Sequence, residues 1–287
     1  MPKIILILTL VIAAALFSGC RNTGSKQPDM ERFYAWCIVP FDYQERTPEQ
    51  RIEMLKELGF TAYAYDWREK HLPEMAREIQ LARDNNIDVT AVWMWLDKND
   101  AAGNLSENNR KVLEALAETG LETQIWVSFP EDYFEGTDEE EKVENASEMI
   151  SYVSLEAEDL GCKVGLYNHG GWFGRPENLV RIIENMPRLD LGIVFNFHHA
   201  HDMIEQFPEL VKTMEPYLWA VNLNGMNPGG PKILPIGKGE KEAEMVAALE
   251  ENGYNGPYGI LGHVEDADVK KILSKNLEGL KALPIDK

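Results

Sequence analysis

Eight short apolar runs recur along this chain, and most of them are continuous rather than alternating with polar residues. Continuous apolar runs are typical of parallel strands that are covered on both faces. Helical patterns separate the runs, so the elements alternate between strand and helix. The predicted strands are Phe33–Phe41, Thr61–Tyr65, Val89–Leu96, Gln124–Phe129, Val164–Tyr167, Leu191–Phe195, Leu218–Leu223 and Tyr258–Leu261.

The number of runs and the lengths of their connections favour one closed barrel. Several strand-to-helix connections are long, at residues 97–105, 130–137 and 224–241, whereas the helix-to-strand turns are short. This asymmetry is typical of (β/α)₈ barrels, which carry their working loops at the C-terminal ends of the strands. The competing fold is an open doubly wound sheet, which is disfavoured because no phosphate-binding glycine loop follows the first strand. We therefore predict a single-domain α/β fold, a TIM barrel, over residues 32–287.

The beginning of the chain has the pattern of an export signal. Lys3 precedes an apolar run at residues 4–17, which ends in small residues and Cys20. This order is typical of secretory signals, and the cysteine resembles the acylated residue of the bacterial lipobox. We predict a signal peptide at 1–19 and a lipidated Cys20 with a polar tether at 20–31. An ordinary cleaved signal is the alternative. The expected location is the bacterial cell envelope, periplasmic or outer-membrane associated, with membrane contact only through the lipid.

Charge and cysteine content restrict the partners. The formal net charge is −20, and no basic stripe offsets it. Such a chain repels nucleic acid, and its charge also argues against a phosphorylated or polyanionic substrate. Besides Cys20, we expect Cys37 and Cys162 to be buried thiols, because their spacing suggests neither a disulfide framework nor a metal site.

The histidines indicate where the chemistry lies. All six fall at or just beyond the C-terminal end of a predicted strand, and none falls on a helix. In a barrel these ends converge around one rim. We predict that His169, His199 and His263 point into one cavity there. Strand alternation places His198 and His201 outside the immediate site.

Other polar and aromatic residues follow the same strand ends. Trp172 comes after two glycines and offers a flat face for a sugar ring. Asn196 and Asn224 can donate hydrogen bonds to a ligand. Trp95 either lines the site or fills the barrel, and Asp66 is either a catalytic acid–base group or a cap for its loop.

Four motifs resemble those of the xylose isomerase-like barrels, the sugar isomerase and epimerase superfamily. Residues 166–169 (LYNH) are similar to the family's L-E-N-H, and residues 194–199 (VFNFHH) to its L-x-D-x-x-H. Residues 236–240 (IGKGE), which include Lys238, resemble its G-x-G-[DE]. Residues 253–256 (GYNG) resemble its G-Y-x-G. The resemblance covers residues 33–282 and implies a TIM barrel that acts on sugars, with Lys238 as a substrate-binding residue.

The departures from these motifs concern the metal. The resemblance implies a divalent ion held by Glu, Asp, His and Glu on the last four strands. This chain has Tyr167, Asn196, Asn222 and Leu261 or Gly262 at those places. A hard cation prefers carboxylates, so the usual metal site is not expected. A softer site made of His169, His199 and His263 stays open.

The residues and the resemblance together predict an exported enzyme that removes a proton next to the carbonyl of an unphosphorylated sugar. Epimerisation, isomerisation and β-elimination, for example of a 3-keto-glycoside, all begin this way. His169 and His199 are the expected bases, because histidine titrates near neutral pH, and Asp66 is the next candidate. His263 is expected to bind substrate. The alternatives are a carbohydrate-binding lipoprotein without activity and a glycoside hydrolase that uses Asp66 and Glu131.

Overall fold

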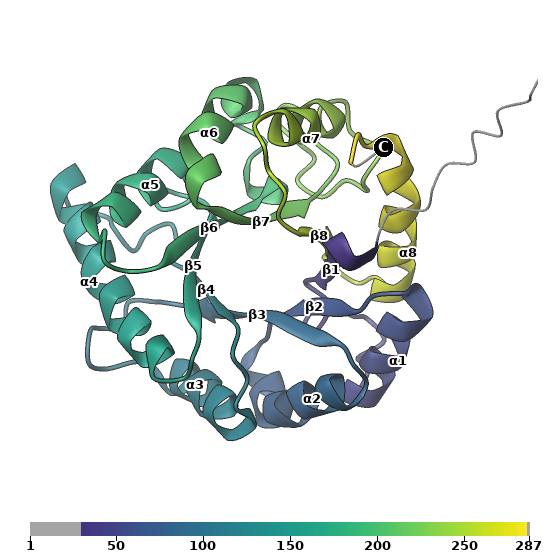
Figure 1. Ribbon diagram of the computed structural model, residues 1–287, viewed down its shortest axis with the longest axis horizontal. Coiled ribbons are helices and arrows are strands. Elements are labelled where there is room, and N and C mark those ends of the chain that lie inside the picture. The colour runs from purple at the N-terminus through teal and green to yellow at the C-terminus, as the bar shows by residue number, and fades with distance from the viewer. Residues whose placement is uncertain (1–29, 286–287) are drawn as a thin grey trace, which may run out of the picture.

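A closed barrel of eight parallel strands forms the centre of the protein. The structure is a computed structural model, and it describes residues 30–285. Each strand pairs with its neighbours in chain order, and β1 closes the barrel against β8 (Figure 1). The strands are β1 (Phe33–Trp36), β2 (Ala62–Tyr65), β3 (Asp88–Trp95), β4 (Gln124–Ser128), β5 (Lys163–Tyr167), β6 (Leu191–Asn196), β7 (Leu218–Leu223) and β8 (Tyr258–Leu261).

Within residues 30–285, eight α-helices surround the barrel and cover its outer face (Figure 1). Their ends follow local sequence signals. Thr47 and Gln50 form a capping box at the start of the first helix, and Gly59 ends that helix with φ of 80°. The helices are α1 (Pro48–Leu58), α2 (Leu72–Asp84), α3 (Glu107–Thr119), α4 (Glu139–Glu158), α5 (Pro176–Asn185), α6 (Phe207–Met214), α7 (Glu242–Glu251) and α8 (Val269–Gly279).

The predicted TIM barrel is confirmed, and all eight predicted strands overlap strands of the structure. The largest difference is at the first strand, which ends at Trp36 rather than Phe41. Cys37 adopts φ of 56°, and this left-handed conformation turns the chain out of the sheet. Ile38 and Val39 are nevertheless buried, so the apolar run continues as a packed loop.

Large aromatic side chains fill the barrel below the strand ends. Trp36 lies edge-on to Trp126, with ring centroids 5.1 Å apart, and Tyr167 stacks beside Trp126 at 6.2 Å. A Cβ atom on Gly165 would lie 3.1 Å from Cδ1 of Trp126, so a glycine at this position makes room for the indole. The barrel interior is therefore solid, and a ligand can enter only above this aromatic layer.

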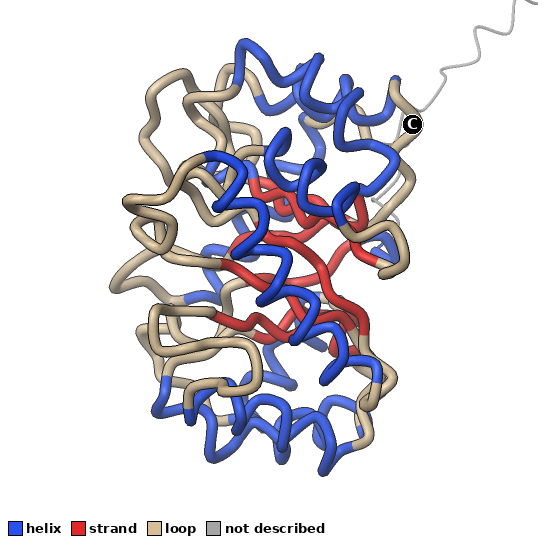
Figure 2. Tube along the Cα trace, turned by 90° about the vertical axis from the view of Figure 1, so that its left-hand side faces the viewer, coloured by secondary structure: helices blue, strands red, loops and turns tan. Residues whose placement is uncertain are grey.

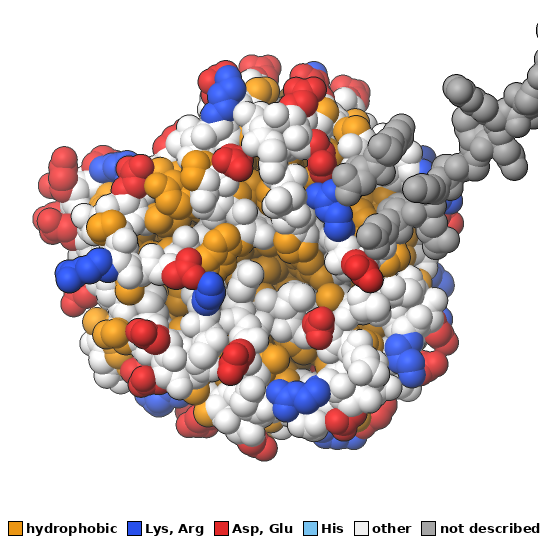
Figure 3. Space-filling model, viewed as in Figure 1, with side chains coloured by type: hydrophobic (Ala, Val, Ile, Leu, Met, Phe, Trp, Pro, Cys, Tyr) orange, Lys and Arg blue, Asp and Glu red, His pale blue; other side chains and the backbone are white. Residues whose placement is uncertain are grey.

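The loops gather more heavily at one end of the barrel (Figure 2). The long connections run from strand to helix, and the longest lies between β7 and α7. Seen along the barrel, hydrophobic side chains occupy the centre of the face, and acidic and basic ones are interspersed around its rim (Figure 3).

Two further predictions concern the cysteines and the export signal. Cys37 and Cys162 are buried free thiols, as predicted. Cys20 and the signal at 1–19 lie outside the described residues, as does most of the tether. Among residues 30–285, no helix combines the length and hydrophobicity that a bilayer span requires.

Candidate active site

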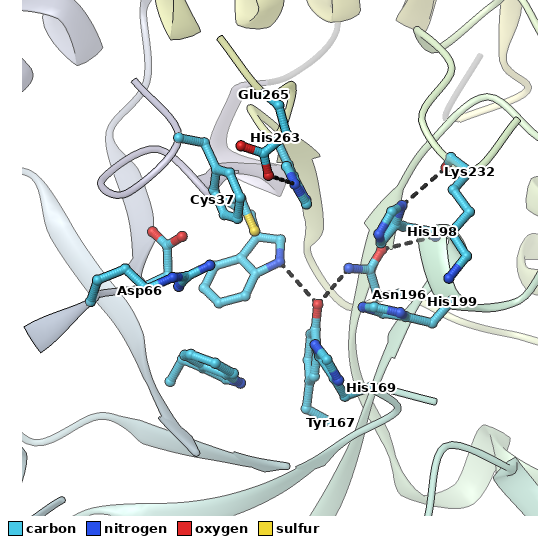
Figure 4. A pocket seen from close by; sticks show the side chains of 14 residues that line it. Cys37, Asp66, Tyr167, His169, Asn196, His198, His199, Lys232, His263 and Glu265 are labelled. Atoms are coloured by element: carbon cyan, nitrogen blue, oxygen red, sulfur yellow. Dashed lines mark hydrogen bonds and ion pairs between the residues drawn. The ribbon is translucent and has the colours of Figure 1, made fainter. Parts of the chain in front are cut away.

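A cavity of about 310 Å³ opens at the C-terminal ends of the strands. Side chains from six strand ends and from the β7–α7 loop meet there (Figure 4). Acidic, basic, imidazole and aromatic groups all contribute, so the cavity can hold a ligand that is both polar and partly apolar. Its lining consists of Trp36, Cys37, Phe41, Asp66, Arg68, Trp93, Tyr167, His169, Asn196, His198, His199, Lys232, His263 and Glu265.

Asp66 is the buried carboxylate of this cavity. It follows β2 and is only 2% exposed. The Val39 N–H donates a hydrogen bond to Asp66 Oδ1 at 3.3 Å, whereas Oδ2 is buried without a partner among the described residues. Burial raises the pKa of Asp66 to about 6, although the Val39 N–H and the Arg68 charge act in the opposite direction. This carboxylate changes its protonation near neutral pH, and the Cys37 thiol lies beside it in the cavity.

His169 and His199 lie together on the opposite side of the cavity. Their ring centroids are 4.6 Å apart. Burial lowers the pKa of His169 to about 4 and that of His199 well below its ordinary value. His169 Nδ1 is buried without a hydrogen-bond partner in the described part of the chain. Both imidazoles are therefore neutral at pH 7 and can donate or accept hydrogen bonds.

His263 lies on the rim, between an aromatic ring and a carboxylate. The centroid of its ring lies 3.6 Å from that of Phe41, and its Nε2 atom lies 3.2 Å from Glu265 Oε1. Burial lowers the pKa of His263, while Glu265 acts in the opposite direction. His169, His199 and His263 thus line one cavity.

His198 corrects the expectation from strand alternation, because it also lines the cavity. β6 ends at Asn196, and a 3₁₀ turn over Phe197–His199 replaces the alternation that would have turned His198 away. His198 Nδ1 lies 3.0 Å from the carbonyl oxygen of Lys232. Burial lowers the pKa of His198 to about 4.

His201 does not line the cavity, but it supports the loop that does. Its Nε2 lies 3.0 Å from the carbonyl oxygen of Lys232, and Nδ1 lies 2.9 Å from that of Asn227. Asn224 Nδ2 donates to the same Lys232 oxygen at 2.8 Å. Asn224, expected to bind substrate, therefore uses its amide to fix the β7–α7 loop.

Three further residues expected to bind substrate lie outside the cavity lining. Trp172 donates a hydrogen bond to Glu139 at 2.8 Å and packs against Phe134. Lys238 is exposed on the β7–α7 loop. Trp95 contacts the site indirectly, because its ring lies edge-on to that of His169 at 4.8 Å.

Some lining residues were not singled out from the sequence. Cys37 and Trp36 belong to an apolar run that reads as core, and the turn after Trp36 brings the thiol to the cavity. Arg68 lies two residues beyond Asp66, so its place after β2 was the available signal. Lys232 lies in the middle of a long loop, where no local pattern distinguishes it.

The positions of the expected metal ligands hold a hydrogen-bonded network instead. Asn196 Nδ2 donates to the Tyr167 hydroxyl oxygen at 2.5 Å, and Trp36 Nε1 donates to it at 3.3 Å. Asn222 accepts a hydrogen bond from the Tyr34 hydroxyl at 2.8 Å. Neutral amides and a phenol are poor ligands for a hard cation. These residues do not fit the metal site that the resemblance implies.

The softer three-histidine site is not formed either. Among residues 30–285, no group of three or more His, Cys, Asp or Glu side chains is arranged to hold a metal ion. His263 lies near His198, with ring centroids 5.4 Å apart, and is already paired with Glu265. This corrects the site left open for His169, His199 and His263.

Solved structures with the same fold include sugar epimerases. D-psicose 3-epimerase in the presence of D-fructose matches with a TM-score of 0.65 and 16% identity, covering 87% of this chain and 96% of that chain. The Clostridium cellulolyticum H10 enzyme with D-tagatose gives 0.63 and 17%, covering 87% and 96%. The E. coli 3-keto-D-glucoside 4-epimerase gives 0.64 and 16%, covering 85% and 97%. These identities establish a shared fold alone.

The chain is similar in sequence to a curated protein and matches a protein family. An uncharacterized protein of Methanocaldococcus jannaschii is 30% identical over 147 residues, or 48% of this chain and 50% of that protein. The chain thus spans about half the length of this relative. The family described as xylose isomerase-like TIM barrel matches residues 52–283, which include seven of the eight strands. The chain belongs to the xylose isomerase-like TIM barrel family.

Proposed function

We propose that this protein is an enzyme that removes a proton from the carbon next to the carbonyl of an uncharged carbohydrate. The observation that carries the proposal is Asp66, a buried carboxylate whose pKa is raised to about 6 and whose Oδ2 has no partner among the described residues. A general base works best when its pKa lies near the working pH. Asp66 meets this condition inside the cavity.

Asp66 replaces the histidines as the first candidate base. The pKa of His169 is lowered to about 4, so its imidazole is a weaker base than the Asp66 carboxylate. His169 and His199 stay neutral, and neutral imidazoles suit hydrogen bonding to sugar hydroxyls. We assign them to substrate binding and orientation.

The cavity suits an uncharged carbohydrate. Its lining holds two acidic side chains, Asp66 and Glu265, and two basic ones, Arg68 and Lys232. This balance does not favour a phosphorylated ligand. The flat ring of Trp93 at the cavity wall suits the apolar face of a sugar. Proteins of the same fold include a 3-keto-D-glucoside 4-epimerase, so a keto-glycoside is the substrate class to test first.

We infer the cellular location of the proposed activity from the lipobox pattern. A lipid on Cys20 would hold the barrel at the membrane surface through the tether at 20–31, in the bacterial cell envelope. Unphosphorylated sugars are the carbohydrates to be expected outside the cytoplasm, which agrees with the charge balance of the cavity.

One observation favours a second candidate, a carbohydrate-binding protein without activity. Tyr167 and Asn196 occupy two of the expected metal-ligand positions and hydrogen-bond to each other. A protein that had lost catalysis while keeping its sugar site would show such replacements. The glycoside hydrolase alternative has less support, because Glu131 does not line the cavity with Asp66.

Hydrogen exchange tests the proposal. The protein is incubated in D₂O with methyl 3-keto-glucoside, D-fructose or D-tagatose, and loss of the proton next to the carbonyl is followed by NMR. We expect Asp66→Asn to slow exchange by roughly 10²-fold or more, the usual contribution of a positioned base. Asp88→Asn is the matched control, because Asp88 is exposed at the start of β3, at the other end of the barrel.

The outcomes separate the candidates. Exchange that is undiminished in Asp66→Asn would remove Asp66 as the base. Binding of a sugar without exchange in the unaltered protein, both with a chelator and with added divalent cations, would favour the binding protein.

A further inference from the structure

We propose that the Tyr167 hydroxyl donates a hydrogen bond to the substrate carbonyl oxygen and holds it as it becomes an enolate. This inference rests on the proposed function and adds the electrophile that proton removal requires. Proton abstraction next to a carbonyl is fast only when the negative charge that develops on oxygen is stabilised. Tyr167 stands at the position where the resemblance places a metal-binding glutamate.

The hydrogen bonds of Tyr167 leave its hydrogen free. Its oxygen receives two hydrogen bonds, from Asn196 Nδ2 at 2.5 Å and from Trp36 Nε1 at 3.3 Å. An indole N–H can only donate. Neither partner therefore uses the hydroxyl hydrogen, and residues 30–285 provide no other hydrogen bond to this group. Because Tyr167 lines the cavity, its O–H is available to a ligand there.

The orientation of the Asn196 amide is fixed independently. The main-chain N–H of His198 donates to Asn196 Oδ1 at 3.0 Å. Turning the amide by 180° would place its NH₂ group against that N–H, donor against donor. The amide nitrogen must therefore face Tyr167, so Asn196 donates to the hydroxyl oxygen and cannot accept its hydrogen.

The network is rigid before a ligand binds. Tyr167 is 2% exposed, and its ring packs against Trp36 and Trp126. Asn168 Oδ1 accepts a hydrogen bond from the Asn196 main-chain N–H at 2.6 Å and so joins the end of β6 to that of β5. A donor that is already in place needs no reorganisation when charge develops on the substrate, which is the condition for effective electrostatic catalysis.

The electrostatics of the site keep Tyr167 in its donating form. Burial raises the pKa of Tyr167 far above its ordinary value, so the phenol keeps its hydrogen at neutral pH. The hydrogen bonds from Asn196 and Trp36 act in the opposite direction by stabilising negative charge on the phenol oxygen. The same two bonds strengthen the O–H as a donor, because they polarise it toward its acceptor.

The proposed step balances in protons and electrons. The carbon–hydrogen bond next to the carbonyl breaks, and its proton passes to an oxygen of Asp66. Its electron pair forms a carbon–carbon double bond, while the C=O π pair moves to the carbonyl oxygen. The resulting negative charge accepts the hydrogen bond from Tyr167. Return of a proton to the carbon restores the carbonyl, and Asp66 and Tyr167 end the cycle unchanged.

The test is the exchange assay with Tyr167→Phe and methyl 3-keto-glucoside. Removing one oxyanion donor typically costs about 10² to 10³ in kcat. We expect a loss of this size, with KM changed by less than about fivefold because the lost bond strengthens mainly in the transition state. Tyr34→Phe is the matched control. Tyr34 is as buried as Tyr167, and its hydroxyl donates to Asn222 rather than lining the cavity.

A spectroscopic measurement on the unaltered protein guards against a folding defect in the variant. The ¹³Cζ resonance of Tyr167, assigned in the unaltered protein through its backbone connectivities, should shift when methyl 3-keto-glucoside binds, and that of Tyr34 should not. Exchange that is normal in Tyr167→Phe, or a Tyr167 resonance unmoved by bound sugar, would overturn the inference and leave the proposed function standing. Absence of exchange in the unaltered protein would overturn both.

Discussion

The imidazole rings of His169 and His199 lie 4.6 Å apart at the centroids, and neither carries a charge at neutral pH. Two imidazolium ions at this distance in a buried site would repel each other and would lack solvation. The pair therefore links the folded state to pH, because both groups gain protons more readily once the chain unfolds.

This linkage predicts loss of stability in acid. The folded-state pKa of His169 is lowered to about 4, so its contribution is present above the ordinary histidine pKa near 6.5 and is lost as pH falls toward 4. We expect the free energy of unfolding to fall less steeply between pH 6.5 and 4 in His169→Gln/His199→Gln. Urea unfolding at four pH values measures this. Parallel pH curves for the variant and the unaltered protein would contradict it.

The rate of proton exchange should follow the ionisation of Asp66. Its pKa is raised to about 6, and only the carboxylate form accepts a proton. We expect kcat/KM for methyl 3-keto-glucoside to rise about tenfold per pH unit below 6 and to level off above it. The measurement is the exchange rate at limiting substrate from pH 3 to 8. An inflection near pH 4 would instead assign the base to His169.

The buried Asp66 carboxylate should lower the free energy of unfolding at high pH, whereas the buried histidines lower it in acid. A carboxyl whose folded-state pKa is raised contributes stability below its ordinary pKa near 4, and this is lost as pH rises through about 6. We therefore expect Asp66→Asn to raise the free energy of unfolding at pH 8 by up to roughly 3 kcal/mol. The gain should vanish at pH 4, and Asp88→Asn should show no such gain. An Asp66→Asn variant that is less stable at pH 8 would show that the native carboxylate is not strained by burial.

The anchor prediction concerns Cys20. If this cysteine carries the lipid, Cys20→Ser should move the protein from the membrane fraction to the soluble one, because the acyl chains supply the attachment. Cys162→Ser is the matched control, because Cys162 is a buried thiol of the barrel. Fractionation of cells that express each variant measures the outcome. Retention of Cys20→Ser in the membrane would refute the lipobox interpretation.

The strands could be predicted because each one is an apolar run that must be buried on both faces. Asp66 and His169 could be placed near the site because they lie one and two residues beyond a strand end, where the chain has little freedom to turn away. Trp172 could not be placed. Gly170 and Gly171 adopt φ of 118° and 59°, and the chain turns between them and carries the indole toward Glu139.

The place of Lys232 in the cavity could not be predicted from the sequence either. This residue reaches the cavity from the middle of a long loop, and its place depends on contacts from residues that are distant in sequence. His198, His201 and Asn224 all contact its carbonyl oxygen. Only the folded loop shows that these side chains contact the main chain of residue 232.

These three contacts have an evolutionary consequence. They are made to the main-chain oxygen of residue 232, which is present whatever amino acid the codon specifies. The β7–α7 loop therefore holds the side chain of residue 232 at the cavity, whichever amino acid stands there. Ligand preference can drift through substitutions at this one position while the loop keeps its path, so a single inherited barrel can give rise to relatives with different ligand selectivity.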